Sequence, residues 1–167
     1  MSSALFSPLS LAGLDLANRL VVSPMCQYSA DDGCANDWHL MHLGMLANSG
    51  AALVIVEASH VERSGRITHG CLGLYSDDNE AALARVIASA RRAGTAKFGI
   101  QLAHSGRKGS AQKPWEGPVA LKAGADPWET IAASPIPFGD QWHTPREATE
   151  ADMNRVRDAF VSAAKRA

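Results

Sequence analysis

The order in which apolar runs alternate with helical segments constrains the fold of this chain more than any other feature. Residues 52–56 (Ala-Leu-Val-Ile-Val) form a continuous apolar run that ends at Glu57. Such a run is typical of a strand covered on both faces of a parallel sheet. Apolar segments at 19–23 and 97–102 predict two further strands. Helix start signals lie between and after these strands, at Asn36–Asp37, Asp77 and Thr149.

This order is typical of right-handed βαβ units with a parallel sheet. A barrel and a doubly wound sheet both satisfy it, but no G-x-G-x-x-G follows the first strand, which weakens the dinucleotide-binding alternative. A (β/α)₈ barrel usually needs about 250 residues, whereas this chain has 167. Three parallel strands cannot close into a barrel, so we expect an α/β fold in which this chain is the first half of a larger structure.

Two other segments have recognisable patterns. Residues 5–16 alternate apolar and polar positions around Ala12-Gly13, which predicts an N-terminal hairpin that closes the bottom of the barrel, with a capping loop as the alternative. Residues 104–144 show no periodicity but contain Trp115, Trp128 and Trp142. A loop of this length in a compact domain is usually the wall or lid of a site, and the tryptophans favour a packed loop.

The composition excludes several classes of function. A formal net charge of −1 and the absence of polybasic runs argue against binding to nucleic acid or to a membrane surface. The three cysteines lack CxxC spacing, which indicates free thiols and a cytoplasmic location. His39 and His42 could share a helix face, but no third ligand follows at a recognisable spacing, so we predict no metal and a hydrogen-bonded, partly exposed histidine instead.

Polar residues follow each predicted strand. They are Ser23 to Tyr28 after the first strand, Glu57 and Ala58 after the second, and Gln101 and His104 near the end of the third. Because the carboxyl ends of parallel strands share one edge of the sheet, sites gather there. A thiol, a phenol and an amide suit a flat heterocycle with mixed donor and acceptor edges better than a metal or phosphoryl centre.

Two alternatives for these residues remain open at the level of sequence. Gln101 could instead satisfy the backbone of a neighbouring loop. Cys26 could be a nucleophile with His104 or His60 as its base, although no flanking signature supports that assignment.

Motifs recur from about Leu5 to the last helix. They are the segments 18–28 (NRLVVSPMCQY), 36–39 (NDWH), 56–58 (VEA), 65–67 (GRI), 101–108 (QLAHSGRK) and 114–117 (PWEG). In this order they resemble the Old Yellow Enzyme family of FMN-dependent ene-reductases, in particular its bacterial branch of xenobiotic reductases and thermophilic-like enzymes. The resemblance implies a (β/α)₈ barrel that binds FMN and uses NAD(P)H to reduce the C=C bond of α,β-unsaturated carbonyls by hydride transfer from flavin N5. It also implies that residues 1–167 form one incomplete domain, the N-terminal half of this TIM barrel, which a complementary C-terminal half-barrel chain would complete.

The resemblance also implies roles for individual residues. Ser23, Pro24, Met25 and Cys26 would border the isoalloxazine ring, Ala58 would contact it, and Gln101 would hydrogen-bond to its pyrimidine edge. Cys26 would tune the flavin potential, and Tyr28 would face the enone substrate. The assembled barrel would form a homo-oligomer.

Other parts of the family's site have no match in this chain. The histidine pair that polarises the substrate, the proton-donating tyrosine and the phosphate loops belong to the second half of the family's barrel. The alternative to an enzyme half is a non-catalytic half-barrel that self-associates through its sheet edges and binds no flavin.

Overall fold

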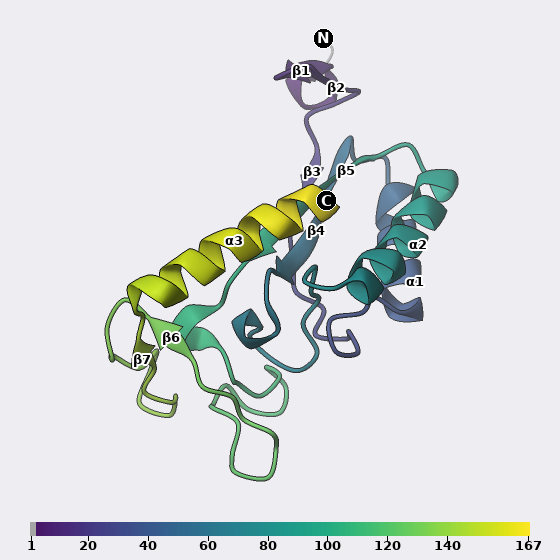
Figure 1. Cartoon of the computed structure of the whole chain (residues 1–167). Coiled ribbons are helices and arrows are strands. Elements are labelled where there is room, and N and C mark those ends of the chain that lie inside the picture. The colour runs from purple at the N-terminus through teal and green to yellow at the C-terminus, as the bar shows by residue number, and fades with distance from the viewer. Residues whose placement is uncertain (1–2) are drawn as a thin grey trace.

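The computed structural model describes residues 3–167, which form a partial barrel around a parallel sheet. Strands β3 (Val21–Val22), β4 (Leu53–His60) and β5 (Lys97–Ala103) lie in the order β3-β4-β5 (Figure 1). Val21 pairs with Leu53, and Leu53 pairs with Lys97. The predicted parallel sheet is therefore confirmed, with a first strand shorter than the expected 19–23.

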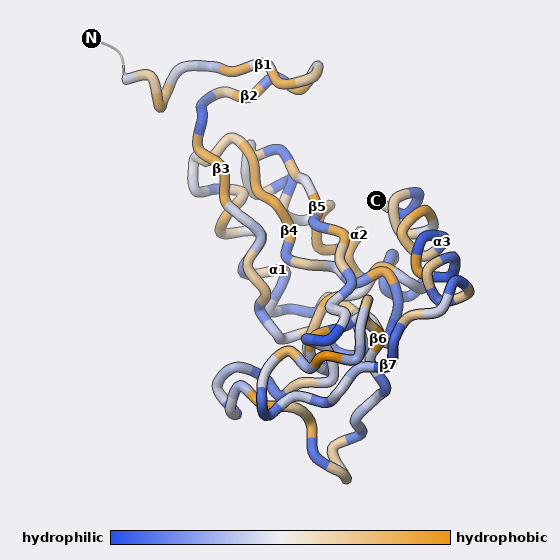
Figure 2. Tube along the Cα trace, turned by 90° about the vertical axis from the view of Figure 1, so that its left-hand side faces the viewer, coloured by the Kyte–Doolittle hydropathy of each residue, from blue (hydrophilic) through white to orange (hydrophobic). Residues whose placement is uncertain are grey.

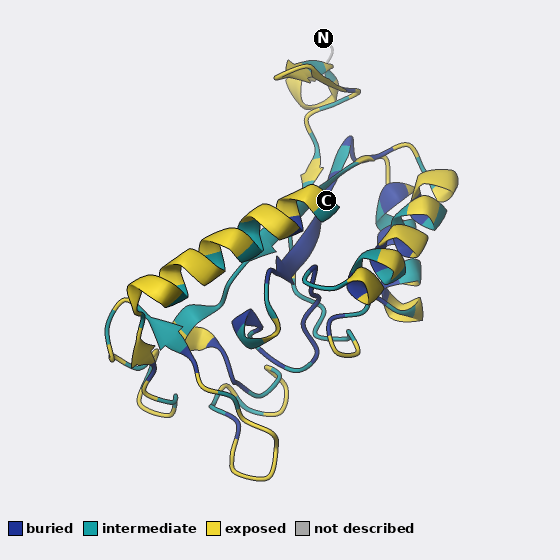
Figure 3. Ribbon diagram, viewed as in Figure 1, coloured by how far each residue is buried: buried dark blue, intermediate teal, exposed yellow. Residues whose placement is uncertain are grey.

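The central strand is the most deeply buried part of the sheet. β4 is covered on both faces, as its continuous apolar run predicts, and appears dark in Figure 3. The edge strands are more open, and Val21 in β3 is 50% exposed. The pairing of β4 with β5 shifts register between Val56 and Ser59. This irregularity changes the alternation of side chains, so that every residue from 56 to 60 is buried.

Helices α1 (Asp37–Ala47) and α2 (Asp77–Ala93) pack side by side against the sheet (Figure 1). Asn36 caps α1 and forms a reciprocal capping box with His39. Ser76 caps α2, whose apolar stripe includes Leu83 and Val86. α2 ends at Gly94, where a Cβ would lie 2.0 Å from the carbonyl oxygen of Ala47. Glycine is therefore required there by the close approach of α1.

Helix α3 (Glu150–Arg166) crosses in front of β5 and is largely exposed (Figure 3). Its predicted start is confirmed, because Thr149 and Asp152 form a capping box. Ala163 faces the core, and Arg166 pairs with Asp77 and Glu80 at the start of α2. These contacts attach the end of α3 to the neighbouring helix.

The predicted hairpin consists of β1 (Leu9–Leu11) and β2 (Leu14–Leu16). Ala12 and Gly13 both adopt positive φ values, 48° and 86°, as a two-residue hairpin turn of the primed type requires. The hairpin lies beyond the amino ends of the strands, apart from the main body (Figures 1 and 2).

The segment after β5 has little regular structure and is packed only in part, since Trp115 is 66% exposed. It contains the short elements η3 (Gly106–Lys108), β6 (Ile131–Ala132) and β7 (Arg146–Glu147), and two more 3₁₀ turns, η1 (Ala4–Phe6) and η2 (Arg63–Gly65), lie earlier in the chain. Trp128 Nε1 donates to the carbonyl of Ser64 at 2.8 Å, and Trp142 packs against Phe138 at 5.1 Å between ring centroids. Within residues 3–167, no helix is both long and apolar enough to cross a membrane.

Candidate active site at the carboxyl ends of the strands

The parallel sheet places the candidate residues at one edge. Ser23 to Tyr28 leave the end of β3, and Ala58 and Gln101 lie in the carboxyl-terminal parts of β4 and β5. Ala58 is buried; Pro24, Cys26 and Tyr28 are half-buried; Ser23, Met25 and Gln101 are exposed. The edge thus combines an apolar floor with accessible polar groups.

Tyr28 is held in an unusual backbone conformation. Its φ is +52°, in the left-handed region that a bulky residue rarely adopts. The next turn closes when the Ala30 amide donates to the Gly70 carbonyl at 2.9 Å. A Cβ on Gly70 would lie 2.3 Å from the Tyr28 carbonyl oxygen, so Gly70 permits this approach. The Tyr28 ring packs edge-on against Trp115, with centroids 6.0 Å apart.

The Cys26 thiol is not activated as a nucleophile. Burial, with smaller contributions from the nearby Cys71 and Glu57, raises its pKa to about 11, although a hydrogen bond with the Ala58 backbone and the Lys108 charge act in the opposite direction. The thiol is therefore protonated near neutral pH, whereas a nucleophilic cysteine needs a lowered pKa. This environment argues against the cysteine-nucleophile alternative.

The two histidines considered as its base are not available for that role, because His104 is hydrogen-bonded to other groups and His60 is buried and neutral. His104 Nε2 lies 3.0 Å from Glu62 Oε1, and the Gly106 amide donates to His104 Nδ1. His60 is 1% exposed, and burial, together with the charges of His104 and Arg66, lowers its pKa to about 4.

Gln101 projects from an edge strand and is exposed. Its carboxamide therefore faces solvent and can meet an external partner with both a donor and an acceptor. Gln101 is thus accessible to an external partner, and its binding role stays a prediction.

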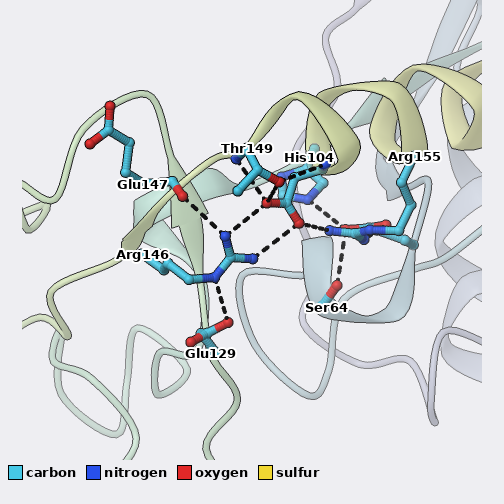
Figure 4. A network of polar contacts seen from close by, with 9 residues as sticks. Ser64, His104, Glu129, Arg146, Glu147, Thr149 and Arg155 are labelled. Atoms are coloured by element: carbon cyan, nitrogen blue, oxygen red, sulfur yellow. Dashed lines mark hydrogen bonds and ion pairs between the residues drawn. The ribbon is translucent and has the colours of Figure 1, made fainter.

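A network of charged groups anchors the segment after β5 and the start of α3 to this edge (Figure 4). Arg155 on α3 pairs with Glu62, which follows β4, and with Asp152. Arg146 pairs with Asp152 at 2.8 Å and with Glu129 at 3.0 Å. Although burial acts to raise the pKa of Glu62, hydrogen bonds from Arg155, His104 and Ser64 lower it. The network fixes one side of the site.

Two polar residues at this edge, Glu57 and His39, are buried against each other, which the sequence did not predict. Glu57 and His39 are 5% and 1% exposed, and their side chains approach to 3.5 Å. The expectation of a partly exposed histidine is wrong for His39, because α1 turns it inward toward the end of β4. The available signal was the carboxylate of Glu57 directly after the apolar run 52–56, since a buried charge needs partners.

The site is an open wall rather than an enclosed pocket. A cavity of about 10 Å³ lies behind it, among Ser23, Met25, His39 and Glu57. A cavity of about 420 Å³ lies elsewhere, between α2, β5 and the end of α3. In the described part of the chain, no group of three or more histidine, cysteine or acidic side chains is arranged to hold a metal ion.

Comparison with known proteins agrees with this fold. Residues 4–167 match the sequence model of the NADH:flavin oxidoreductase / NADH oxidase family. An NADPH dehydrogenase of Geobacillus thermodenitrificans is 40% identical over 169 residues, which cover 100% of this chain and 45% of that protein. The chain therefore spans about half the length of the curated relatives it matches.

Solved structures show the same architecture. Morphinone reductase in complex with tetrahydroNAD superposes with a TM-score of 0.79 at 24% identity, over 99% of this chain and 46% of that one. Old Yellow Enzyme from Pichia sp. AKU4542 superposes with a TM-score of 0.80 at 20% identity, over 98% and 42% of the two chains. These likenesses show the fold, a part of a TIM barrel.

Proposed function

Because this chain belongs to the NADH:flavin oxidoreductase / NADH oxidase family, we propose that it forms one wall of the FMN site in an NAD(P)H-dependent ene-reductase. The observation that carries this proposal is the placement of Cys26, Ala58 and Gln101 at the carboxyl ends of three adjacent parallel strands. Sites of barrel enzymes are built at this end.

The chemistry of the wall fits a flavin ring. Pro24 and Ala58 offer an apolar surface against which a flat ring can lie, and the Cys26 thiol is a neutral, weak hydrogen-bond donor. The exposed Gln101 carboxamide can both donate to and accept from a mixed edge. Ser23 and Met25 are exposed beside this surface. We assign these residues to cofactor binding.

Bound FMN would supply hydride transfer from NAD(P)H to the C=C bond of an α,β-unsaturated carbonyl. In this scheme Cys26 tunes the flavin potential and Tyr28 faces the substrate. Burial raises the pKa of Tyr28 to about 12, and the neighbouring Cys26, Cys71 and Glu57 add to the effect. The phenol therefore stays protonated and can donate a hydrogen bond to a substrate oxygen.

We further propose that a complementary C-terminal half-barrel supplies the phosphate site and the proton donor. Support comes from the open edges of β3 and β5, and from relatives more than twice as long as the matched segment. Ile136 and Phe138, both exposed in the segment after β5, offer apolar surface for a homo-oligomer of the assembled barrel. The free thiols of Cys26, Cys34 and Cys71 suit the cytoplasm.

Flavin retention tests the proposal directly. The chain would be purified alone and together with the C-terminal half of a relative, and each preparation would be examined for flavin absorbance and NADPH-dependent reduction of an enone. We expect retained FMN and activity only in the assembled protein. A colourless, inactive assembly that self-associates would instead support the alternative, a non-catalytic half-barrel.

A second outcome would contradict the need for a complement. If the chain alone bound one FMN per monomer and reduced the enone, the wall would be a complete site. Mass analysis of the intact assembly distinguishes these outcomes, because it reports both the second chain and the bound flavin.

A further inference from the structure

A buried carboxylate connects the end of β4 to the loop that carries Cys26 and Tyr28. The backbone amide of Gln27, which lies between those two residues, donates to Glu57 Oε2 at 2.9 Å. Glu57 Oε1 lies 3.5 Å from His39 Nε2 on α1. A carboxylate that is 5% exposed is costly unless it is paired, and these two groups are its partners.

The hydrogen bonds at the other ring nitrogen indicate the tautomer of His39. The Asn36 backbone amide donates to His39 Nδ1 at 3.2 Å, and Asn36 Oδ1 lies at the same distance from that nitrogen. Because a backbone amide can only donate, we assign the proton of the neutral ring to Nε2. His39 Nε2 makes no hydrogen bond in the described part of the chain and lies 3.5 Å from Glu57 Oε1, so the two buried side chains are in polar contact.

Asn36 carries the connection back to the same loop. Its side-chain Nδ2 donates to the carbonyl of Ser29 at 2.6 Å. The path from Gln27 through Glu57, His39 and Asn36 to Ser29 thus holds the residues on both sides of Tyr28. Between these two anchors Tyr28 keeps its φ of +52°, a conformation that persists only when its surroundings enforce it.

We propose that Asn36, His39 and Glu57 form a positioning relay that sets the Tyr28 phenol and the Cys26 thiol against their ligands. The identity of those ligands rests on the proposed function, whereas the contacts that form the relay do not depend on it. None of the three residues needs to touch cofactor or substrate. Each acts through the backbone of residues 27–29.

Glu57 also has an electrostatic effect on the site. Its negative charge disfavours ionisation of the nearby Cys26 and Tyr28. The other groups that act on the Cys26 thiol are Cys71, which opposes ionisation, and Lys108, which favours it. His42 on α1 also faces Glu57. Neutralising Glu57 should therefore make the Cys26 thiolate more accessible while His42 and Lys108 stay in place.

Amide exchange and ring nitrogen shifts test the relay in the full chain without flavin. Glu57→Ala removes the acceptor of the Gln27 amide, and we expect that amide to exchange roughly tenfold faster. Glu57→Gln keeps an oxygen acceptor and should change the rate less than about threefold. Glu62→Ala is the matched control, because Glu62 belongs to the other network and should leave the Gln27 amide unchanged. Nitrogen-15 shifts should place the His39 proton on Nε2.

Alkylation of Cys26 by iodoacetamide, followed by mass spectrometry of its peptide, reports the charge effect. Glu57→Gln should speed the reaction about threefold to tenfold at pH 8, since the thiolate fraction rises tenfold per pKa unit.

Unchanged Gln27 exchange in Glu57→Ala, or a His39 proton on Nδ1, would overturn the relay. If Glu57→Ala does not fold, the His39 tautomer and the Cys26 alkylation rate in Glu57→Gln still decide, and an unchanged alkylation rate counts against the charge effect. Loss of flavin binding in the assembled protein would count against the proposed function instead.

Discussion

Burial around the Cys26 thiol and the Tyr28 phenol raises both pKa values, to about 11 and about 12. Both groups are therefore neutral hydrogen-bond donors at physiological pH, and neither is poised for proton abstraction or nucleophilic attack. A neutral donor at this position suits the stabilisation of charge that develops on a bound ring or substrate.

In the proposed assembled flavoprotein, Cys26→Ala would remove that donor. Because a donor stabilises the electron-rich reduced ring, we expect the flavin midpoint potential to fall by roughly 30–60 mV, the equivalent of one hydrogen bond to a charged group. Reduction by NADPH should slow, and oxidation by the enone should quicken. Cys34→Ser, which alters a thiol away from the strand ends, is the control. Unchanged potentials in Cys26→Ala would remove the tuning role.

His60 gives the fold a dependence on pH. Burial is the main cause that lowers its pKa to about 4, whereas an unfolded histidine titrates near 6.5. Above pH 6.5 the imidazole is neutral in both states and has no effect. As the pH falls from 6.5 to 4, only the unfolded chain binds the proton, so the free energy of unfolding should drop by up to about 3 kcal/mol.

Urea unfolding of the wild type and His60→Leu at pH 7, 5.5 and 4.5 measures this effect. The leucine variant removes the titrating group, so its stability should decline less over the same interval. Parallel curves for the two proteins would show that His60 does not contribute.

At the level of elements, side chains at the helix starts determine where α1 and α3 begin. Asn36 and Thr149 each occupy the N-cap of a capping box. The cap side chain accepts from the backbone amide three residues later, and the side chain of that residue accepts from the cap amide. In α3 this N3 residue is Asp152, which also forms ion pairs with Arg146 and Arg155 (Figure 4). The cap of α3 is therefore continuous with the network that reaches Glu62 at the end of β4.

Thr149→Ala should cost about 1 kcal/mol of the free energy of unfolding, because it removes an N-cap acceptor and loosens the position of Asp152. Ser162→Ala in the exposed part of the same helix is the control and should change stability by less than about 0.5 kcal/mol. Equal effects of the two substitutions, measured by denaturant titration, would contradict a specific role for the cap.

On the scale of the whole molecule, one side of the structure remains uncovered. Trp38, Met41 and Met45 on α1 are 47%, 52% and 61% exposed, although they recur at helical spacing as residues of a buried stripe do. Trp38 Nε1 donates to Gln27 Oε1 at 3.2 Å, in the segment that follows β3, an edge strand in the described part of the sheet. The exposure of the three α1 residues suits a surface that a further part of the barrel covers.

Hydroxyl-radical footprinting tests this interpretation. In the assembled protein, oxidation of Met41 and Met45 should fall several-fold relative to the chain alone, since a packed helix would exclude solvent. The same measurement with an unrelated protein in place of the complement is the control. Oxidation that does not change on assembly would mean that this stripe faces solvent in the complete barrel.

Sequence patterns were sufficient to predict the parallel sheet, the hairpin turn at Ala12-Gly13 and the starts of the three helices. These features depend on local signals, such as the apolar run at 52–56 and the caps at Asn36 and Thr149, which act within a few residues. The position of the strand-end residues on one edge also followed, because parallel connection leaves no other arrangement. The roles of Cys26, Tyr28 and Gln101 remain predictions.

Only the tertiary structure decided what holds these residues in place. Glu57, His39 and Asn36 meet across two elements, and their pairing depends on burial and on the register shift in β4. Neither is visible in local spacing, and so His39 was expected to be partly exposed. The sequence by itself determined which elements form and in which order. Long-range packing decided which polar groups are buried, and therefore which ones must find partners around Tyr28.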